Sequence, residues 1–105
     1  MNSAGLRTSI DDRSEPRIDV IHRTRLACMD GVERLATVVN VSARGLMVRV
    51  DGEYGEGDRV QIMLPRVGKV AAEVRWSLGG RIGCRLERMI GMSDYHQLLQ
   101  AIRRA

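Results

Sequence analysis

The chain has 105 residues, enough for one domain with one modest hydrophobic core. Hydrophobic residues make up 44% of it and aromatic residues only 3%, so we expect a folded protein with an aliphatic core rather than a disordered chain. The formal net charge is +4, and Lys69 is the one lysine among 17 basic residues. An arginine-rich, basic protein favours anionic partners.

Membrane-spanning, secreted and metal-binding proteins are disfavoured by what the sequence lacks. No segment approaches the ~20 apolar residues that cross a bilayer. The N-terminus has no apolar core of a signal peptide, so we expect a cytoplasmic protein without membrane insertion. Cys28 and Cys84 have neither CxxC spacing nor a histidine cluster, which favours two buried thiols over a metal site or a disulfide. We expect no metal and no cofactor.

Residues 1–12 are polar and show no periodicity, so we expect a flexible N-terminal tail. Arg13 and Arg17 follow, with Pro16 between them. Proline biases the residue before it toward extended backbone. We therefore expect residues 13–17 to form an extended strap that carries two arginines, rather than one face of a helix.

Residues 18–88 show the alternation of apolar and polar side chains that is typical of β-strands facing a core on one side. Gly-rich turns separate the segments, and the gaps are too short for the helical crossovers of a parallel sheet. The pattern predicts an all-β, six-stranded antiparallel barrel or small sandwich. The six segments are 18–29, 35–41, 46–50, 59–64, 69–76 and 81–87.

The periodicity becomes helical over residues 93–104, with Ser93 or Asp94 as the expected N-cap. The apolar stripe of this helix is narrow. We favour a helix that plugs one mouth of the barrel, over one that lies along its outside or contacts another copy.

Asp30-Gly31 predicts a hairpin between the first two strands, and we expect a bulge near His22. One hairpin register places Ser42 opposite His22, and the other places Gly45 opposite Pro16. In both registers the polar turn from Asn40 to Gly45 lies beside the start of the first strand. We therefore expect it to lie within reach of the arginine strap.

No catalytic constellation accompanies this turn. His22 and His96 are far apart in the sequence, and Ser42 has neither a GxSxG elbow nor a base beside it. The protein is therefore not expected to be an enzyme. Arginines facing a small polar turn predict a binding site instead, because guanidinium groups form bidentate bonds to phosphates and to guanine O6 and N7.

Two motifs give the chain a specific resemblance. Residues 13–17, Arg-Ser-Glu-Pro-Arg, match the RxxxR motif of PilZ domains, and residues 40–45, Asn-Val-Ser-Ala-Arg-Gly, match their (D/N)xSxxG motif. The spacing between the motifs also matches, and residues 74–76 and 81–86 resemble the late strands of the family. The chain is identified as a member of the PilZ family over residues 13–104.

The resemblance implies a six-stranded antiparallel β-barrel with a C-terminal helix, and a bacterial receptor or adaptor for the second messenger cyclic di-GMP. It implies that Arg13 and Arg17 wrap the ligand, and that Asn40, Ser42 and Gly45 hold it from the barrel. Arg44 occupies a position that the motif does not specify. We infer that it makes an auxiliary contact to a ligand phosphate; the alternative is an ordinary exposed arginine.

Asp12 stands where many members of the family carry a further arginine, associated with a stacked pair of ligand molecules. We therefore expect one ligand molecule per domain, or weaker binding. At 105 residues we expect a stand-alone protein that signals through an unidentified protein target in motility, biofilm or exopolysaccharide control.

Two alternatives remain open at this point. The first is a PilZ-type protein-interaction module that does not bind the nucleotide, which the acidic residues near the strap would favour. The second is a small-barrel nucleic-acid-binding protein, which the basic charge favours. The near absence of aromatic residues for base stacking argues against the second.

Overall fold

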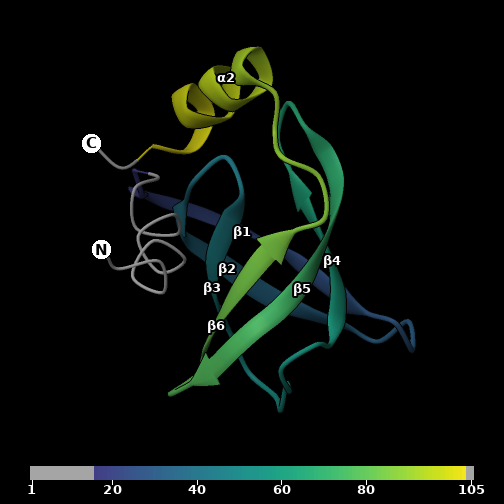
Figure 1. The fold of residues 1–105 in the computed structure, drawn as a ribbon. Coiled ribbons are helices and arrows are strands. Elements are labelled where there is room, and N and C mark those ends of the chain that lie inside the picture. Colours follow the sequence, from purple (N-terminus) through teal and green to yellow (C-terminus); the bar gives the residue numbers. More distant parts are fainter. Residues whose placement is uncertain (1–15, 104–105) are drawn as a thin grey trace, which may run out of the picture.

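The computed structural model describes residues 16–103. Its strands close into one antiparallel barrel in the order β1-β2-β3-β6-β5-β4 (Figure 1). The elements are β1 (Ile18–Cys28), β2 (Glu33–Val41), β3 (Gly45–Val50), β4 (Arg59–Leu64), β5 (Gly68–Leu78), β6 (Arg81–Leu86) and α2 (Met92–Ile102). The predicted six-stranded antiparallel barrel with a C-terminal helix is confirmed. Residues 1–12, Arg13 and Arg104 lie outside the described residues.

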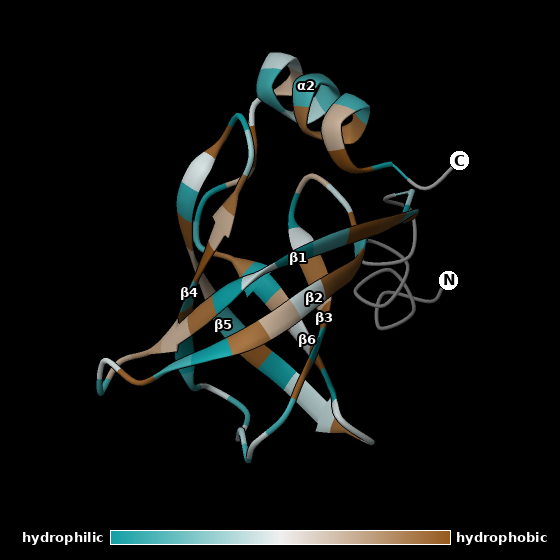
Figure 2. Cartoon of the chain, turned by 180° about the vertical axis from the view of Figure 1, so that it is seen from behind, coloured by the Kyte–Doolittle hydropathy of each residue, from teal (hydrophilic) through white to brown (hydrophobic). Residues whose placement is uncertain are grey.

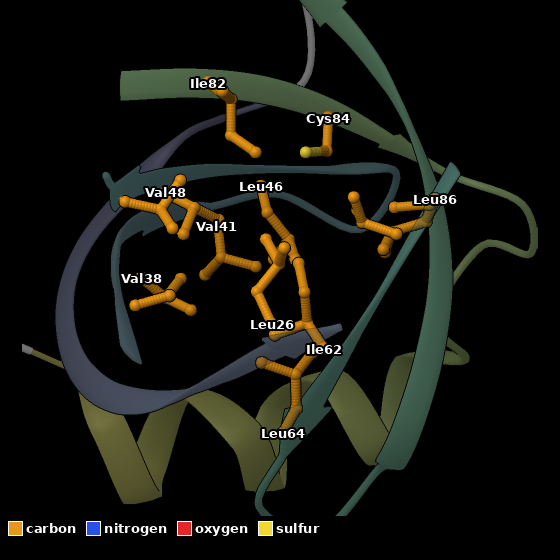
Figure 3. Close-up of a cluster of buried hydrophobic side chains, with 14 of the residues drawn as sticks. Leu26, Val38, Val41, Leu46, Val48, Ile62, Leu64, Ile82, Cys84 and Leu86 are labelled. Carbon is orange, nitrogen blue, oxygen red and sulfur yellow. The ribbon is translucent and has the colours of Figure 1, made fainter. Parts of the chain in front are cut away.

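The core is aliphatic and fills the inside of the barrel (Figure 3). Hydrophobic and hydrophilic residues alternate along the strands (Figure 2) because successive side chains point to opposite faces of a strand. Burying each of these Val, Leu or Ile side chains contributes roughly 1.5–3 kcal/mol. Those buried to less than 2% relative exposure are Val20, Leu26, Val38, Val41, Leu46, Val48, Val60, Ile62, Leu64, Val74, Ile82 and Leu98.

The β1–β2 hairpin places the polar turn beside the start of β1, as predicted, but in a different register. Asp19 pairs with Asn40, and Ile18 pairs with Val41. Both predicted registers are therefore wrong, for two reasons. The hairpin turn has neither of the two lengths that were assumed, and the pairing shifts by one more residue further along the strands. That shift lies between Asp19 and His22, so the bulge predicted near His22 is confirmed.

The barrel is covered at both ends. Helix α2 lies across one end (Figure 1), with Leu98 and Ile102 buried, so it occupies the position of the predicted plug. Its N-cap is Gly91 rather than the predicted Ser93 or Asp94, which lie inside the first turn. After the helix, Arg103 forms a bridge to Val20 of β1. The loop between β3 and β4 contributes the half-buried Tyr54, which packs against the core.

Two further bulges change which side chains face outward. One lies between Val38 and Asn40 where β2 pairs with β3, and the other lies between Val74 and Trp76 where β5 pairs with β6. A bulge adds one residue to a strand and so reverses the faces beyond it. Trp76, which the alternation places on the apolar face, is therefore on the outer wall and 39% exposed.

Candidate functional site

The polar turn between β2 and β3 is closed by its own backbone. The Ser42 N–H donates to the Gly45 carbonyl at 2.9 Å, and the Arg44 N–H lies 3.4 Å from the Ser42 hydroxyl oxygen, which accepts. Ser42 is only 4% exposed. Among residues 16–103, the Ser42 hydroxyl donates its proton to no acceptor. A buried hydroxyl with an unused donor can bind a ligand oxygen or nitrogen without losing an existing bond.

The segment after β6 holds the same turn from the other side. The Arg44 carbonyl accepts the Leu86 N–H at 2.8 Å, and the Ala43 carbonyl accepts the Ile90 N–H at 2.9 Å. From α2, the Tyr95 hydroxyl donates to the Val41 carbonyl at 3.3 Å. The turn is therefore anchored to both β6 and the helix, and its shape is set before any ligand arrives.

Gly45 is required by a close approach of two backbones. A Cβ at Gly45 would lie 3.0 Å from the Cys84 carbonyl oxygen of β6 and 3.7 Å from the Ser42 hydroxyl oxygen. Gly45 is not among the residues with positive φ. Its role is thus to admit the neighbouring strand, rather than to turn the chain through the left-handed region.

The structure brings one arginine of the strap to the turn. Arg17 Nη1 donates to the Asn40 side-chain carbonyl at 3.5 Å, and Asn40 Nδ2 lies at the same distance from the Met47 sulfur. These contacts orient the Asn40 amide on the outer wall. Residues 17 and 40, distant in the chain, are therefore neighbours, as predicted. Arg13 and Glu15 lie outside the described residues.

Arg44 and Arg17 are both exposed at this end of the wall. The Arg44 backbone is held by β6, while its exposed side chain extends from the turn. Its predicted auxiliary role stays a prediction. The two guanidinium groups make this end of the barrel attractive to anions.

Sequence reasoning missed an apolar surface next to Asn40. Met47 pairs with Asn40 on one side and with Gly83 on the other, and Gly83 pairs with Trp76. A Cβ at Gly83 would lie 2.1 Å from Trp76 Nε1, so the indole ring occupies the space over the glycine. We call Asn40, Met47, Gly83 and Trp76 the floor row. Strand alternation places Met47 outside, but no sequence signal reveals the β5 bulge that turns Trp76 outward.

The thiols and histidines do not form a metal site. Within residues 16–103, no three His, Cys, Asp or Glu side chains gather as metal ligands would. Cys28 and Cys84 are free, as predicted, but only Cys84 is buried; Cys28 is half-buried. Burial raises the pKa of the Cys84 thiol to about 12, which keeps it neutral at physiological pH.

Across the part of the chain that the structure describes, no helix has the length and apolar character needed to cross a membrane.

Comparison with models of protein families matches residues 11–104 to the PilZ domain, which includes both the strap and the turn. Comparison with curated proteins finds no match.

Proposed function

The chain belongs to the PilZ domain family, and from that premise we propose that it is a cytoplasmic bacterial receptor for cyclic di-GMP that acts as an adaptor, not as an enzyme. PilZ domains are in general binding and adaptor modules for this nucleotide. The observation that carries the proposal for this chain is the contact between Arg17 and Asn40, because it joins the two motifs in one place. A titration of the chain with cyclic di-GMP tests the proposal.

In the proposed complex, Arg13 and Arg17 bind the phosphates and a guanine edge through their guanidinium groups, which suit both kinds of acceptor. Asn40 and the buried Ser42 hydroxyl bind polar atoms of the ligand from the barrel side. Nothing in the binding needs a metal ion, a nucleophile or a general base. Residues 13–17 act as a lid and residues 40–45 as a preformed floor.

The floor row supplies what the hydrogen-bonding groups lack, an apolar surface for a purine. Trp76 is the one tryptophan of the chain, and its half-exposed ring lies in the same transverse row as Asn40. Stacking of a base on an aromatic side chain contributes roughly 1–3 kcal/mol. We therefore include Trp76 and Met47 in the proposed ligand surface, beside the motif residues.

The relay to a protein target follows from how the turn is anchored. Ligand binding fixes the strap over the turn, and the turn is hydrogen-bonded to the β6–α2 connection and to α2 through Ile90 and Tyr95. A strap that closes on the ligand presents a new surface beside α2. The target would belong to motility, biofilm or exopolysaccharide control, as is usual for the family.

Titration calorimetry of the full chain with cyclic di-GMP tests the proposal. We expect saturable binding by the wild type, with one ligand molecule per domain. Arg17→Ala and Arg13→Ala should each weaken binding by about 1–3 kcal/mol, and Ser42→Ala by about 1 kcal/mol. Arg66→Ala is the matched control, because Arg66 is an exposed arginine in the β4–β5 turn.

Absence of binding by the folded wild type would refute the receptor proposal and favour an interaction module that does not bind nucleotide. Equal losses in Arg17→Ala and Arg66→Ala would reduce the site to general attraction between a basic protein and an anion. An oligonucleotide shift assay at two salt concentrations tests the nucleic-acid alternative, since phosphate-driven binding weakens steeply with salt.

A further inference from the structure

A second row of side chains crosses the same outer wall below the floor row. Arg23 of β1 pairs with Thr37 of β2, Thr37 pairs with Arg49 of β3, and Arg49 pairs with Arg81 of β6. We call Arg23, Arg49 and Arg81 the arginine row. Neighbouring strands lie about 4.8 Å apart, so the three Cα atoms fall within about 15 Å across the wall.

Three other outward arginines lie beside acidic partners, whereas in the described part of the chain the arginine row does not. Arg59 pairs with Glu87, Arg75 lies 3.7 Å from Glu73, and Arg25 lies 4.0 Å from Glu33. Within the described residues, the three side chains of the arginine row form no ion pair, and all three are exposed.

Arg49 and Arg81 are also direct cross-strand partners. Like charges placed opposite one another destabilise a sheet. The row therefore carries positive charge that no acidic side chain among residues 16–103 pairs with. An anionic partner placed along the row would relieve that repulsion.

An exposed apolar side chain continues the row. Leu78 of β5 pairs with Arg81 and is 78% exposed. The hairpin tip that follows it is not loose, because the Gly80 carbonyl accepts the Val50 N–H of β3 at 3.0 Å. Leu78 is thus held beside the arginines, giving a fixed surface that combines three positive charges with one large apolar group.

From this juxtaposition we propose that the arginine row and Leu78 form a docking surface for an acidic segment of a partner protein that also carries apolar side chains. Charge complementarity selects the acidic segment and orients it along the row. Leu78 favours a protein over a nucleic acid, because an exposed leucine gains from apolar contact and gives bases no aromatic surface for stacking.

The surface lies next to the proposed nucleotide site. Arg49 is two residues from Met47 along β3, and Arg81 is two residues from Gly83 along β6, which places the rows about 7 Å apart. This is within the Debye length of about 8 Å at physiological salt. The phosphates of a bound nucleotide would lower the positive potential of the row, so nucleotide binding should weaken the docking of an acidic segment.

This last coupling rests on the proposed function, whereas the docking surface does not. The surface is therefore tested first without nucleotide, on the full chain, by fluorescence anisotropy. The probe is a labelled synthetic peptide of alternating Glu and Leu, and the comparison peptide has Ser in place of Leu. The variant is Arg49→Glu/Arg81→Glu, and the control with the same net charge is Arg66→Glu/Arg88→Glu.

We expect the Glu/Leu peptide to bind the wild type more tightly than the Glu/Ser peptide. Reversing the charges in the row should weaken binding by about tenfold or more, and the control by less than about twofold. Leu78→Ser should remove the preference for leucine and leave the charge dependence. Circular dichroism of each variant confirms that the barrel is folded.

Equal weakening by the variant and the control would overturn the proposal, because binding would then follow net charge alone. The proposal would also be overturned if the wild type bound a DNA duplex more tightly than the Glu/Leu peptide, and if this DNA binding were lost in Arg49→Glu/Arg81→Glu but unchanged in Leu78→Ser. Repeating the titration with saturating cyclic di-GMP tests the coupling. Weaker peptide binding supports it, and unchanged or tighter binding refutes the coupling.

Discussion

The polar turn and the arginine row lie on the same wall of the barrel, but they differ in whether their polar groups have partners within the protein. In the turn, backbone carbonyls of Val41, Ala43 and Arg44 are all hydrogen-bonded to the C-terminal part of the chain. In the arginine row, the guanidinium groups have no acidic partner within the described residues. The turn is therefore preorganised by hydrogen bonds, whereas the arginine side chains of the row can pair with an external anion.

The difference suggests two kinds of recognition on one surface. A small ligand needs precise geometry, and a preorganised floor lowers the entropy lost when it binds. A protein segment can adapt to the long arginine side chains of the row, and charge then sets its orientation and association rate. Four experiments test whether the turn and the row differ in this way.

Gly45→Val should break the turn. The added atoms would meet the Cys84 carbonyl, which belongs to the β3–β6 ladder and cannot move freely. We expect a loss of about 2–3 kcal/mol in the free energy of unfolding, measured by urea denaturation, and loss of nucleotide binding. Gly91→Ala is the control, because no atom lies within 4 Å of the added Cβ. Equal stability of the two variants would contradict the close approach at Gly45.

Raising the pH should weaken the barrel through Cys84, whose backbone carbonyl closely approaches Gly45 of the turn. Burial raises the folded pKa of Cys84 from the ordinary thiol value of 9.0 to about 12, so the neutral thiol stabilises the fold below pH 9. That stability is lost as the pH rises from 9 toward 12, with a limiting slope of about 1.4 kcal/mol per pH unit.

Urea denaturation at a series of pH values measures this loss, and Cys84→Ala should flatten the slope between pH 9 and 12. In the native state, Ellman's reagent should react with the half-buried Cys28 well before the buried Cys84. Equal reaction rates would contradict the burial of Cys84.

Tyr95→Phe should loosen the turn without changing the shape of the core. It removes the hydroxyl that donates to the Val41 carbonyl. We expect a loss of about 0.5–1.5 kcal/mol in stability, together with faster hydrogen exchange in residues 41–45. Tyr54→Phe, at the other end of the barrel, removes the bond from its hydroxyl to the Asp51 carbonyl and serves as the control. Exchange in residues 41–45 that changes equally in both variants would refute the specific link between helix and turn.

Arg49→Ala should slightly stabilise the fold, because it removes the like-charge pair with Arg81. We expect a gain of about 0.2–0.5 kcal/mol in the free energy of unfolding, which shrinks as salt is added. Arg75→Ala is the contrast, since it removes an arginine beside an acidic partner and should not stabilise. Thermal unfolding at low and high salt measures both. Destabilisation by Arg49→Ala that salt does not alter would indicate packing rather than repulsion.

Much of the fold could be predicted from residues taken locally. Alternation identified the six strands and the aliphatic inner face, and a change of period identified the helix, because both patterns follow from backbone geometry. The proximity of Arg17 and Asn40 could be predicted because the two strands of a hairpin run back beside each other, although the predicted register was wrong. Hairpin register depends on turn length and on bulges, which local patterns do not specify.

The class of the protein follows from local features: the strand pattern, the polar turn, the two motifs and the excess of arginine can all be read along the chain. Which of these residues meet depends on how the strands pair. The β5 bulge turned Trp76 onto the outer wall, strand pairing assembled Arg23, Arg49 and Arg81 into one row, and Tyr95 reached the back of the turn. The physical reason is that barrel closure and register depend on all strands at once.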